Sequence, residues 1–143
     1  MADKINLTIS SKKDDTAEYM SLIRLTTSAV ASKIGFDIEE IDDIKVSIGE
    51  ACTNIIKHGL NEGRDSFDIE YTIYTDKLII SVRDNGSGFD TSKIKEPNID
   101  NNIDEIDDSG LGIFIIKSLM DQVEINSSSE KGTEIIMTKI KIA

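Results

Sequence analysis

Two hydrophobic periods divide this chain of 143 residues into strands and helices. Apolar and polar residues alternate along some segments, as in a strand with one buried face. Along others they recur every three or four residues, as in an amphipathic helix. The alternating segments are residues 5–10, 67–75 and 77–83, and the helical segments are residues 16–34 and 38–60. We therefore predict a strand, two helices and then an antiparallel strand pair with Asp76 at its tip.

Residues at the ends of the two predicted helices support these boundaries. Gly35 follows the first helix, and glycine most readily adopts the left-handed conformation that ends a helix. Asp37 is suited to cap the second helix, and Glu39 and Glu40 complement the positive end of its dipole. These signals place the start of the second helix at about Ile38.

The last third of the chain begins with a segment that has no usable period. Residues 90–108 contain the only proline, seven acidic residues and two lysines. A connection of this length in a compact domain is usually a lid, a binding loop or disordered, and we predict a mobile lid. Residues 113–120 are apolar nearly all round and predict a buried helix. Residues 122–126 and 133–142 predict two closing strands.

Length and composition limit the architecture. A chain of 143 residues that is 38% hydrophobic can build one domain with a full core, but not two. The predicted elements suit two packed layers. We therefore expect residues 1–143 to form one domain, an α/β (α+β) two-layer sandwich.

Charge and cysteine content bear on partners and compartment. The net charge of −11 argues against nucleic acid or an anionic membrane as the main partner. The single cysteine, Cys52, lies in an apolar helical stripe, where a small buried side chain is expected and no intramolecular disulfide is possible. The chain has no apolar signal segment and no run of 18 apolar residues. We expect a cytoplasmic protein that does not span a membrane.

The second predicted helix carries an unusual polar stripe. Glu50, Asn54, Lys57 and His58 lie opposite its apolar side, and Glu50 and Asn54 are four residues apart, so they share one face. A solvent-exposed face more often carries lysine and glutamate than asparagine and histidine. The stripe therefore indicates chemistry, although a solvated face is the alternative.

A second polar cluster follows the strand at residues 77–83. Its sequence is Asp84-Asn85-Gly86-Ser87-Gly88-Phe89. Asp84 stands where the strand leaves the sheet, so its carboxylate can point into a cleft. Gly86 and Gly88 lack a Cβ and would let a flat ring or a phosphate approach the backbone. The alternative is an ordinary loop turn, which this composition also suits.

A third cluster, Gly110-Leu111-Gly112, opens the predicted buried helix. The first N–H groups of a helix have no partner within it and lie at the positive end of its dipole. Such a start can bind phosphate, although a Gly-x-Gly sequence alone is a weak signal.

The order of these motifs resembles the ATP-binding fold shared by DNA gyrase, heat-shock chaperones of the ninety-kilodalton class, MutL and histidine kinases. Residues 50–58 resemble its N box, and residues 84–88 and 110–112 resemble its two glycine boxes. Within that GHKL superfamily, the short length, Glu-Ala-Cys-Thr-Asn at residues 50–54 and Met-Thr-Lys at residues 137–139 resemble anti-sigma factors with serine-protein kinase activity, of the RsbW and SpoIIAB kind.

The resemblance implies the Bergerat ATP-binding fold, a mixed and mainly antiparallel sheet with helices on one face. It also implies ATP and Mg²⁺ as cofactors. Glu50 would be the general base, and Asn54 would hold the metal ion. The nucleotide-binding residues would be Asp84 for the adenine amine, Gly86 and Gly88 beside the base, Gly110, Leu111 and Gly112 at the phosphates, and Thr133 in support of the adenine site.

The resemblance also implies partners. They are an RNA polymerase sigma factor and an anti-anti-sigma protein of the STAS type, which would compete for a surface that includes Arg24 in the first helix. The protein would be a homodimer that sequesters the sigma factor and phosphorylates a serine of the antagonist. From the residues alone, Arg24 is equally compatible with a solvated helix face.

Alternative functions are a sequestering module without kinase activity and a detached catalytic domain of a histidine kinase. The second lacks support, because no dimerising helical pair with a phosphoacceptor histidine is present. Some relatives carry a basic residue just before the second glycine box, where this chain has Asp107 and Asp108. Lys93, Lys95 or Lys117 could replace that residue at the terminal phosphate.

Overall fold

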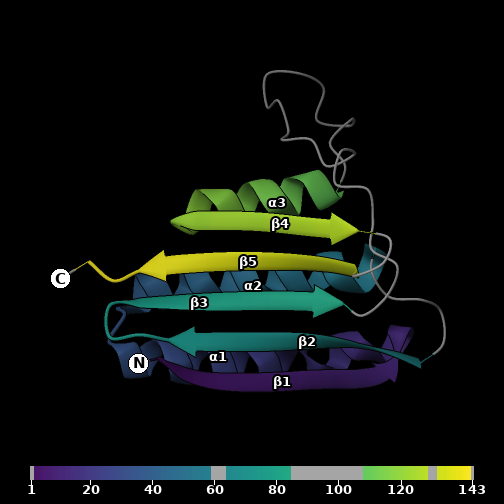
Figure 1. Cartoon of the computed structure of the whole chain (residues 1–143), viewed down its shortest axis with the longest axis horizontal. Coiled ribbons are helices and arrows are strands. Elements are labelled where there is room, and N and C mark those ends of the chain that lie inside the picture. Colours follow the sequence, from purple (N-terminus) through teal and green to yellow (C-terminus); the bar gives the residue numbers. More distant parts are fainter. Residues whose placement is uncertain (1, 59–63, 85–107, 129–131, 143) are drawn as a thin grey trace.

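The protein has one sheet and one layer of helices (Figure 1). The computed structural model describes residues 2–58, 64–84, 108–128 and 132–142. The elements in chain order are β1 (Asp3–Lys12), the 3₁₀ helix η1 (Lys13–Tyr19), α1 (Met20–Ile34), α2 (Ile38–His58), β2 (Arg64–Ile73), β3 (Lys77–Asp84), α3 (Asp108–Leu119), β4 (Gln122–Ser128) and β5 (Gly132–Ile140).

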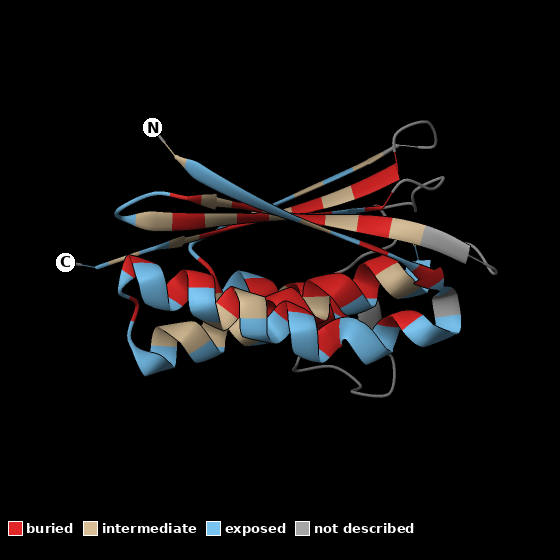
Figure 2. Ribbon diagram, turned by 90° about the horizontal axis from the view of Figure 1, so that it is seen from below, coloured by how far each residue is buried: buried red, intermediate tan, exposed pale blue. Residues whose placement is uncertain are grey.

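The five strands form a sheet in the order β1-β2-β3-β5-β4, and each described pairing is antiparallel. The helices cover one face of it, and the buried residues gather where the two layers meet (Figure 2). The predicted two-layer α/β sandwich is therefore confirmed. The sheet was expected to be mixed, but it contains no parallel pair within the described strands.

The first predicted helix is divided in two. Residues 13–19 form the tighter 3₁₀ helix η1, and α1 begins only at Met20. The first turn of the helix predicted from residue 16 is replaced by the end of η1, which turns the chain from β1 into the helix layer. Gly35 ends α1 as predicted: its φ is 101°, and its N–H donates to the carbonyl oxygens of Ala31 and Ser32.

The start of α2 is fixed by a reciprocal pair of hydrogen bonds. The N–H of Glu40 donates to Oδ1 of Asp37 at 2.8 Å, and the N–H of Asp37 donates to Oε1 of Glu40 at 3.0 Å. This capping box satisfies backbone donors that a helix start otherwise leaves unpaired. The predicted cap at Asp37 is confirmed.

Burial departs from the sequence pattern at both edges of the sheet. On the edge strand β1, Ile9 is buried, but Ile5 is 40% exposed and Leu7 is half-buried. On α3, which was expected to be buried all round, Leu111 is 41% exposed and Phe114 is half-buried. The cause is the same in both places, because an element at the rim of a two-layer fold has packing neighbours on fewer sides.

Cys52 lies in the core, as its apolar surroundings in the sequence predict. It is fully buried, and this burial raises the pKa of its thiol to about 12, although the positive charge of Arg24 opposes the rise. The thiol is therefore protonated at neutral pH and is not a nucleophile. None of the described helices is long and apolar enough to cross a membrane.

A buried hydrogen bond joins the sheet to α1. The hydroxyl groups of Tyr71 on β2 and Thr27 on α1 lie 2.7 Å apart, and Thr27 also donates to the carbonyl oxygen of Ile23. Burial raises the pKa of Tyr71 to about 12, so the phenol keeps its proton and stays available as a donor. The contact fixes α1 against the middle of the sheet.

We expect Tyr71→Phe to lower the free energy of unfolding by about 1 kcal/mol, the usual net contribution of one hydrogen bond. Thr27 keeps its bond to Ile23, which limits the loss. Urea denaturation would measure the change. Tyr74→Phe is the matched control: this tyrosine is 37% exposed, and its loss should cost less than about 0.5 kcal/mol. Equal effects of the two substitutions would contradict the proposed importance of the buried bond.

Candidate functional site

Three segments that are far apart in the sequence lie at the same end of the molecule. They are the C-terminal half of α2, the end of β3 and the start of α3 (Figure 1). Each polar motif has described residues on one of these three segments. Asp84 is the last residue of β3, and Glu50 and Asn54 are on α2.

The contact between α2 and α3 is close at Gly112. A methyl group added to Gly112 would lie 2.9 Å from Oε2 of Glu50 and 3.4 Å from Nδ2 of Asn54. A separation of 2.9 Å is too short for a carbon atom, so any larger residue here would displace the Glu50 carboxylate. The glycine thus allows the α3 backbone to touch the polar stripe of α2.

This contact changes the environment predicted for Asn54. The helical wheel places it with Lys57 and His58 opposite the apolar side, and those two residues are indeed exposed. Asn54 itself is only 3% exposed, and Glu50 is half-buried. The sequence pattern did not predict this burial of Asn54. Asn54 is buried because α3 covers that side of α2.

The buried amide of Asn54 has an unused acceptor. Its Oδ1 makes no hydrogen bond within the described part of the protein. A buried oxygen without a partner costs about 1–3 kcal/mol, so such atoms usually serve a ligand, water or ion. An amide oxygen is a ligand that Mg²⁺ accepts readily, alongside phosphate oxygens and water. Asn54 therefore fits the magnesium ligand that the sequence resemblance implies.

The carboxylate of Asp84 is held by the sheet. Asp84 is fully buried, and its Oδ2 accepts a hydrogen bond from the N–H of Thr133 on β5 at 3.1 Å. Thr133 is also fully buried, and its hydroxyl lies 2.8 Å from that of Ser127 on β4. The structure thus brings Asp84 and Thr133 together. Sequence reasoning missed Ser127, because it lies at the start of a serine-rich segment that is typical of a turn.

Other predicted site residues are placed differently or not at all. Gly86, Gly88, Lys93 and Lys95 lie outside the described residues, as does the predicted lid except for Asp108. This residue begins α3, so the second glycine box lies within the first turns of the helix and not before it. Gly110 is buried in the first turn, and Leu111 faces outward.

A groove of about 520 Å³ runs along α1 and α2 and reaches Glu50. Its lining residues are Arg24, Asp42, Lys45, Val46, Gly49, Glu50 and Thr53. Arg24 is exposed and forms no ion pair within the described ranges, and its Nη2 lies 3.4 Å from where a Cβ on Gly49 would be. One side of Glu50 therefore faces Gly112 and Asn54, and the groove lies on another.

The sequence did not predict this groove, although two of its lining residues, Arg24 and Glu50, were predicted to be functional. The missed signal is Val46, which is 48% exposed on an otherwise polar part of α2. An isolated apolar residue of this kind cannot be distinguished from an ordinary surface residue in a sequence. Gly49 forms part of the groove wall between the two helices, close to the guanidinium group of Arg24.

Comparison with known proteins supports the resemblance on which the site was predicted. Residues 14–139 match the family model described as the histidine kinase-like ATPase domain. The protein named serine-protein kinase RsbW is 37% identical in Bacillus cereus and in Bacillus thuringiensis, and 36% identical in Bacillus mycoides. Each of these alignments covers 96% of this chain and 84% of the relative. The chain therefore belongs to the histidine kinase-like ATPase family and, within it, to the RsbW group of serine-protein kinases.

Proposed function

We propose that this protein is an ATP-dependent anti-sigma factor, which sequesters an RNA polymerase sigma factor and phosphorylates a serine of its anti-anti-sigma antagonist. The use of ATP follows from its family. One observation supports protein phosphorylation in particular: Glu50 stands between the Asn54 and Gly112 junction and an open groove about 520 Å³ in volume. A carboxylate in that position can meet a nucleotide and a protein substrate together.

The adenine base is assigned to the end of β3. Asp84 would accept a hydrogen bond from its exocyclic amine, while the N–H of Thr133 holds the other side of the carboxylate. A fully buried carboxylate needs donors to offset the loss of water, and the base amine supplies one when bound. Gly86 and Gly88, which lie beyond the described part of β3, would let the base approach the backbone.

The phosphates are assigned to the start of α3. Gly110 lies in its first turn, where backbone N–H groups have no partner within the helix. The positive end of the helix dipole also favours negative charge there. Leu111 and Gly112 complete this segment, and the absence of a side chain at Gly112 keeps the space beside Glu50 open.

Asn54 would hold Mg²⁺ through its Oδ1, the buried acceptor without a described partner. The ion would neutralise part of the charge on the phosphate groups. Glu50 has a different task, because a half-buried carboxylate next to the groove can accept a proton from an incoming serine hydroxyl. The serine oxygen forms a bond to the terminal phosphorus as the bond to the bridging oxygen of ADP breaks, and the hydroxyl proton goes to Glu50.

The antagonist would enter along the groove. Its wall carries both signs of charge, with Arg24 and Lys45 alongside Asp42 and Glu50. An exposed arginine with no ion pair in the described ranges is available to an acidic group of a partner. The family resemblance supports the same surface for the sigma factor, so the two partners would compete for it. The resemblance also supports a cytoplasmic homodimer of one-domain subunits.

Glu50→Gln and Asn54→Ala should separate the two proposed roles. Loss of a general base lowers the rate by at least about 100-fold, so Glu50→Gln should nearly abolish serine phosphorylation while ATP affinity stays unchanged. Asn54→Ala should weaken binding of ATP with Mg²⁺ roughly tenfold, or about 1.4 kcal/mol. Isothermal titration with a slowly hydrolysed ATP analogue, together with a transfer assay, would measure both.

Glu39→Gln is the control for this pair, because it removes an exposed carboxylate from the same helix. Its transfer rate and ATP affinity should match those of the wild type. An equal loss of ATP affinity in the Glu50 and Asn54 variants would contradict the division of roles. Normal sigma binding with no transfer by the wild type would favour a sequestering module without kinase activity.

Gly112→Ala should lower the transfer rate about tenfold to 100-fold, because the new methyl group displaces the Glu50 carboxylate. Stability should not fall, since alanine favours a helix by about 1 kcal/mol over glycine. Thermal unfolding and the transfer assay would test both expectations. Gly49→Ala is the matched control for thermal unfolding, as its added Cβ would lie at least 3.4 Å from its neighbours. Full activity of Gly112→Ala would show that Glu50 need not occupy its present position.

Arg24→Ala should weaken binding of both the sigma factor and the antagonist at least tenfold, about 1.4 kcal/mol, and leave ATP binding intact. Surface plasmon resonance with each captured partner would measure this. Lys33→Ala removes a charge from the same helix, where its ion pair with Asp3 is exposed, and should change neither affinity. Unchanged dissociation constants for both partners in Arg24→Ala would mean that Arg24 is only a solvated surface residue.

A further inference from the structure

A chain of hydrogen bonds links Asp84 to the edge of the sheet. Ser127 on β4 is the register partner of Thr133 on β5, and their hydroxyl oxygens are 2.8 Å apart. The N–H of Thr133 in turn donates to Oδ2 of Asp84 at 3.1 Å. The contacts run across three adjacent strands, from β4 through β5 to β3.

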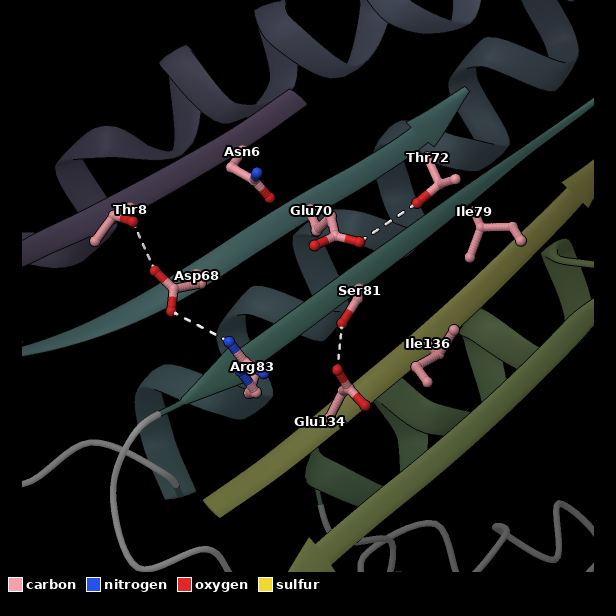
Figure 3. A pocket seen from close by; sticks show the side chains of 10 residues that line it. All are labelled: Asn6, Thr8, Asp68, Glu70, Thr72, Ile79, Ser81, Arg83, Glu134 and Ile136. Carbon is pink, nitrogen blue, oxygen red and sulfur yellow. Dashed lines mark hydrogen bonds and ion pairs between the residues drawn. The ribbon is translucent and has the colours of Figure 1, made fainter. Parts of the chain in front are cut away.

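Both hydroxyl groups lie on the side of the sheet that faces the helices. On β5, Thr133 and Ile135 are buried, whereas Glu134 and Ile136 line a groove on the opposite, uncovered face (Figure 3). Register partners in an antiparallel pair point to the same face, so Ser127 lies on the helix side with Thr133. The pair therefore belongs to the layer that contains the nucleotide site.

The backbone around the Thr133 amide is restrained only weakly by its own sequence. It follows Gly132, whose φ of 79° lies in the left-handed region and whose backbone has the fewest steric restraints. A threonine side chain in a strand has restricted χ1 rotamers, and a hydroxyl bond selects among them. The hydroxyl bond between Ser127 and Thr133 thus restrains the Thr133 side chain, which belongs to the same residue as the N–H group that holds Asp84.

We propose that Ser127 is a positioning residue of the adenine site, which orients Asp84 through Thr133 and so contributes to the recognition of the exocyclic amine. This inference rests on the role proposed above for Asp84. Its chemical consequence is specific: Ser127 matters for purine nucleotides that carry the amine and not for those that lack it.

The test compares ATP with the triphosphate of purine riboside, which has no exocyclic amine. Wild-type protein should bind ATP more tightly. Ser127→Ala should reduce this preference about fivefold, the size expected from one neutral hydrogen bond, and should leave affinity for the purine riboside nucleotide nearly unchanged. Ser127→Thr keeps the hydroxyl and should retain the preference. Isothermal titration of the full chain gives each dissociation constant.

Ser81→Ala is the matched control. Its hydroxyl donates across the strands to Oε2 of Glu134 at 2.8 Å, but it lies on the uncovered face of the sheet (Figure 3). The preference of the Ser81→Ala variant for ATP should equal that of the wild type. The role of Ser127 would be overturned if Ser127→Ala kept the full preference for ATP, or if Ser81→Ala lost as much of it. Either result would leave the role of Asp84 unaffected. No preference in the wild type would overturn both.

Discussion

The approach of α3 to α2 at Gly112 is the contact on which the site depends. A single methyl group there would come within 2.9 Å of the Glu50 carboxylate. Because the glycine has no side chain, the first turns of one helix reach the polar stripe of another. This places a helix start that we propose binds phosphate beside a carboxylate and a buried amide that precede it by about 60 residues in the chain.

Burial of polar groups is the cost of this arrangement. The Oδ1 atom of Asn54 has no partner within the described residues, and Asp84 is a carboxylate with no exposed surface. Both are destabilising unless donors or cations approach them. The sheet meets part of this requirement at Asp84 through the amide of Thr133. The nucleotide and Mg²⁺ proposed for the site would add favourable contacts to both groups, so binding and stability are expected to be coupled.

Glu50 lies between two surfaces for which we propose different binding partners. Towards α3 it contacts the proposed nucleotide site, and towards α1 it borders the groove that contains Arg24. A protein kinase needs such a residue, since the phosphate donor and the acceptor hydroxyl must meet within a few ångströms. Gly49 lies between Glu50 and Arg24 on the groove wall, since a Cβ added to it would lie 3.4 Å from Nη2 of Arg24.

Local structure and the kind of chemistry could be predicted from the amino-acid sequence. Gly35 and the Asp37 cap act through neighbouring backbone atoms, so their effects could be predicted, and so could the strand pair around Asp76. The order of the N box and glycine boxes likewise indicated an ATP-binding fold. The burial of Asn54, the exposure of Ile5 and the contact between Ser127 and Thr133 could be seen only in the folded chain. The reason is physical: a period shows which residues share a face, whereas burial and cross-strand bonds depend on what packs against that face.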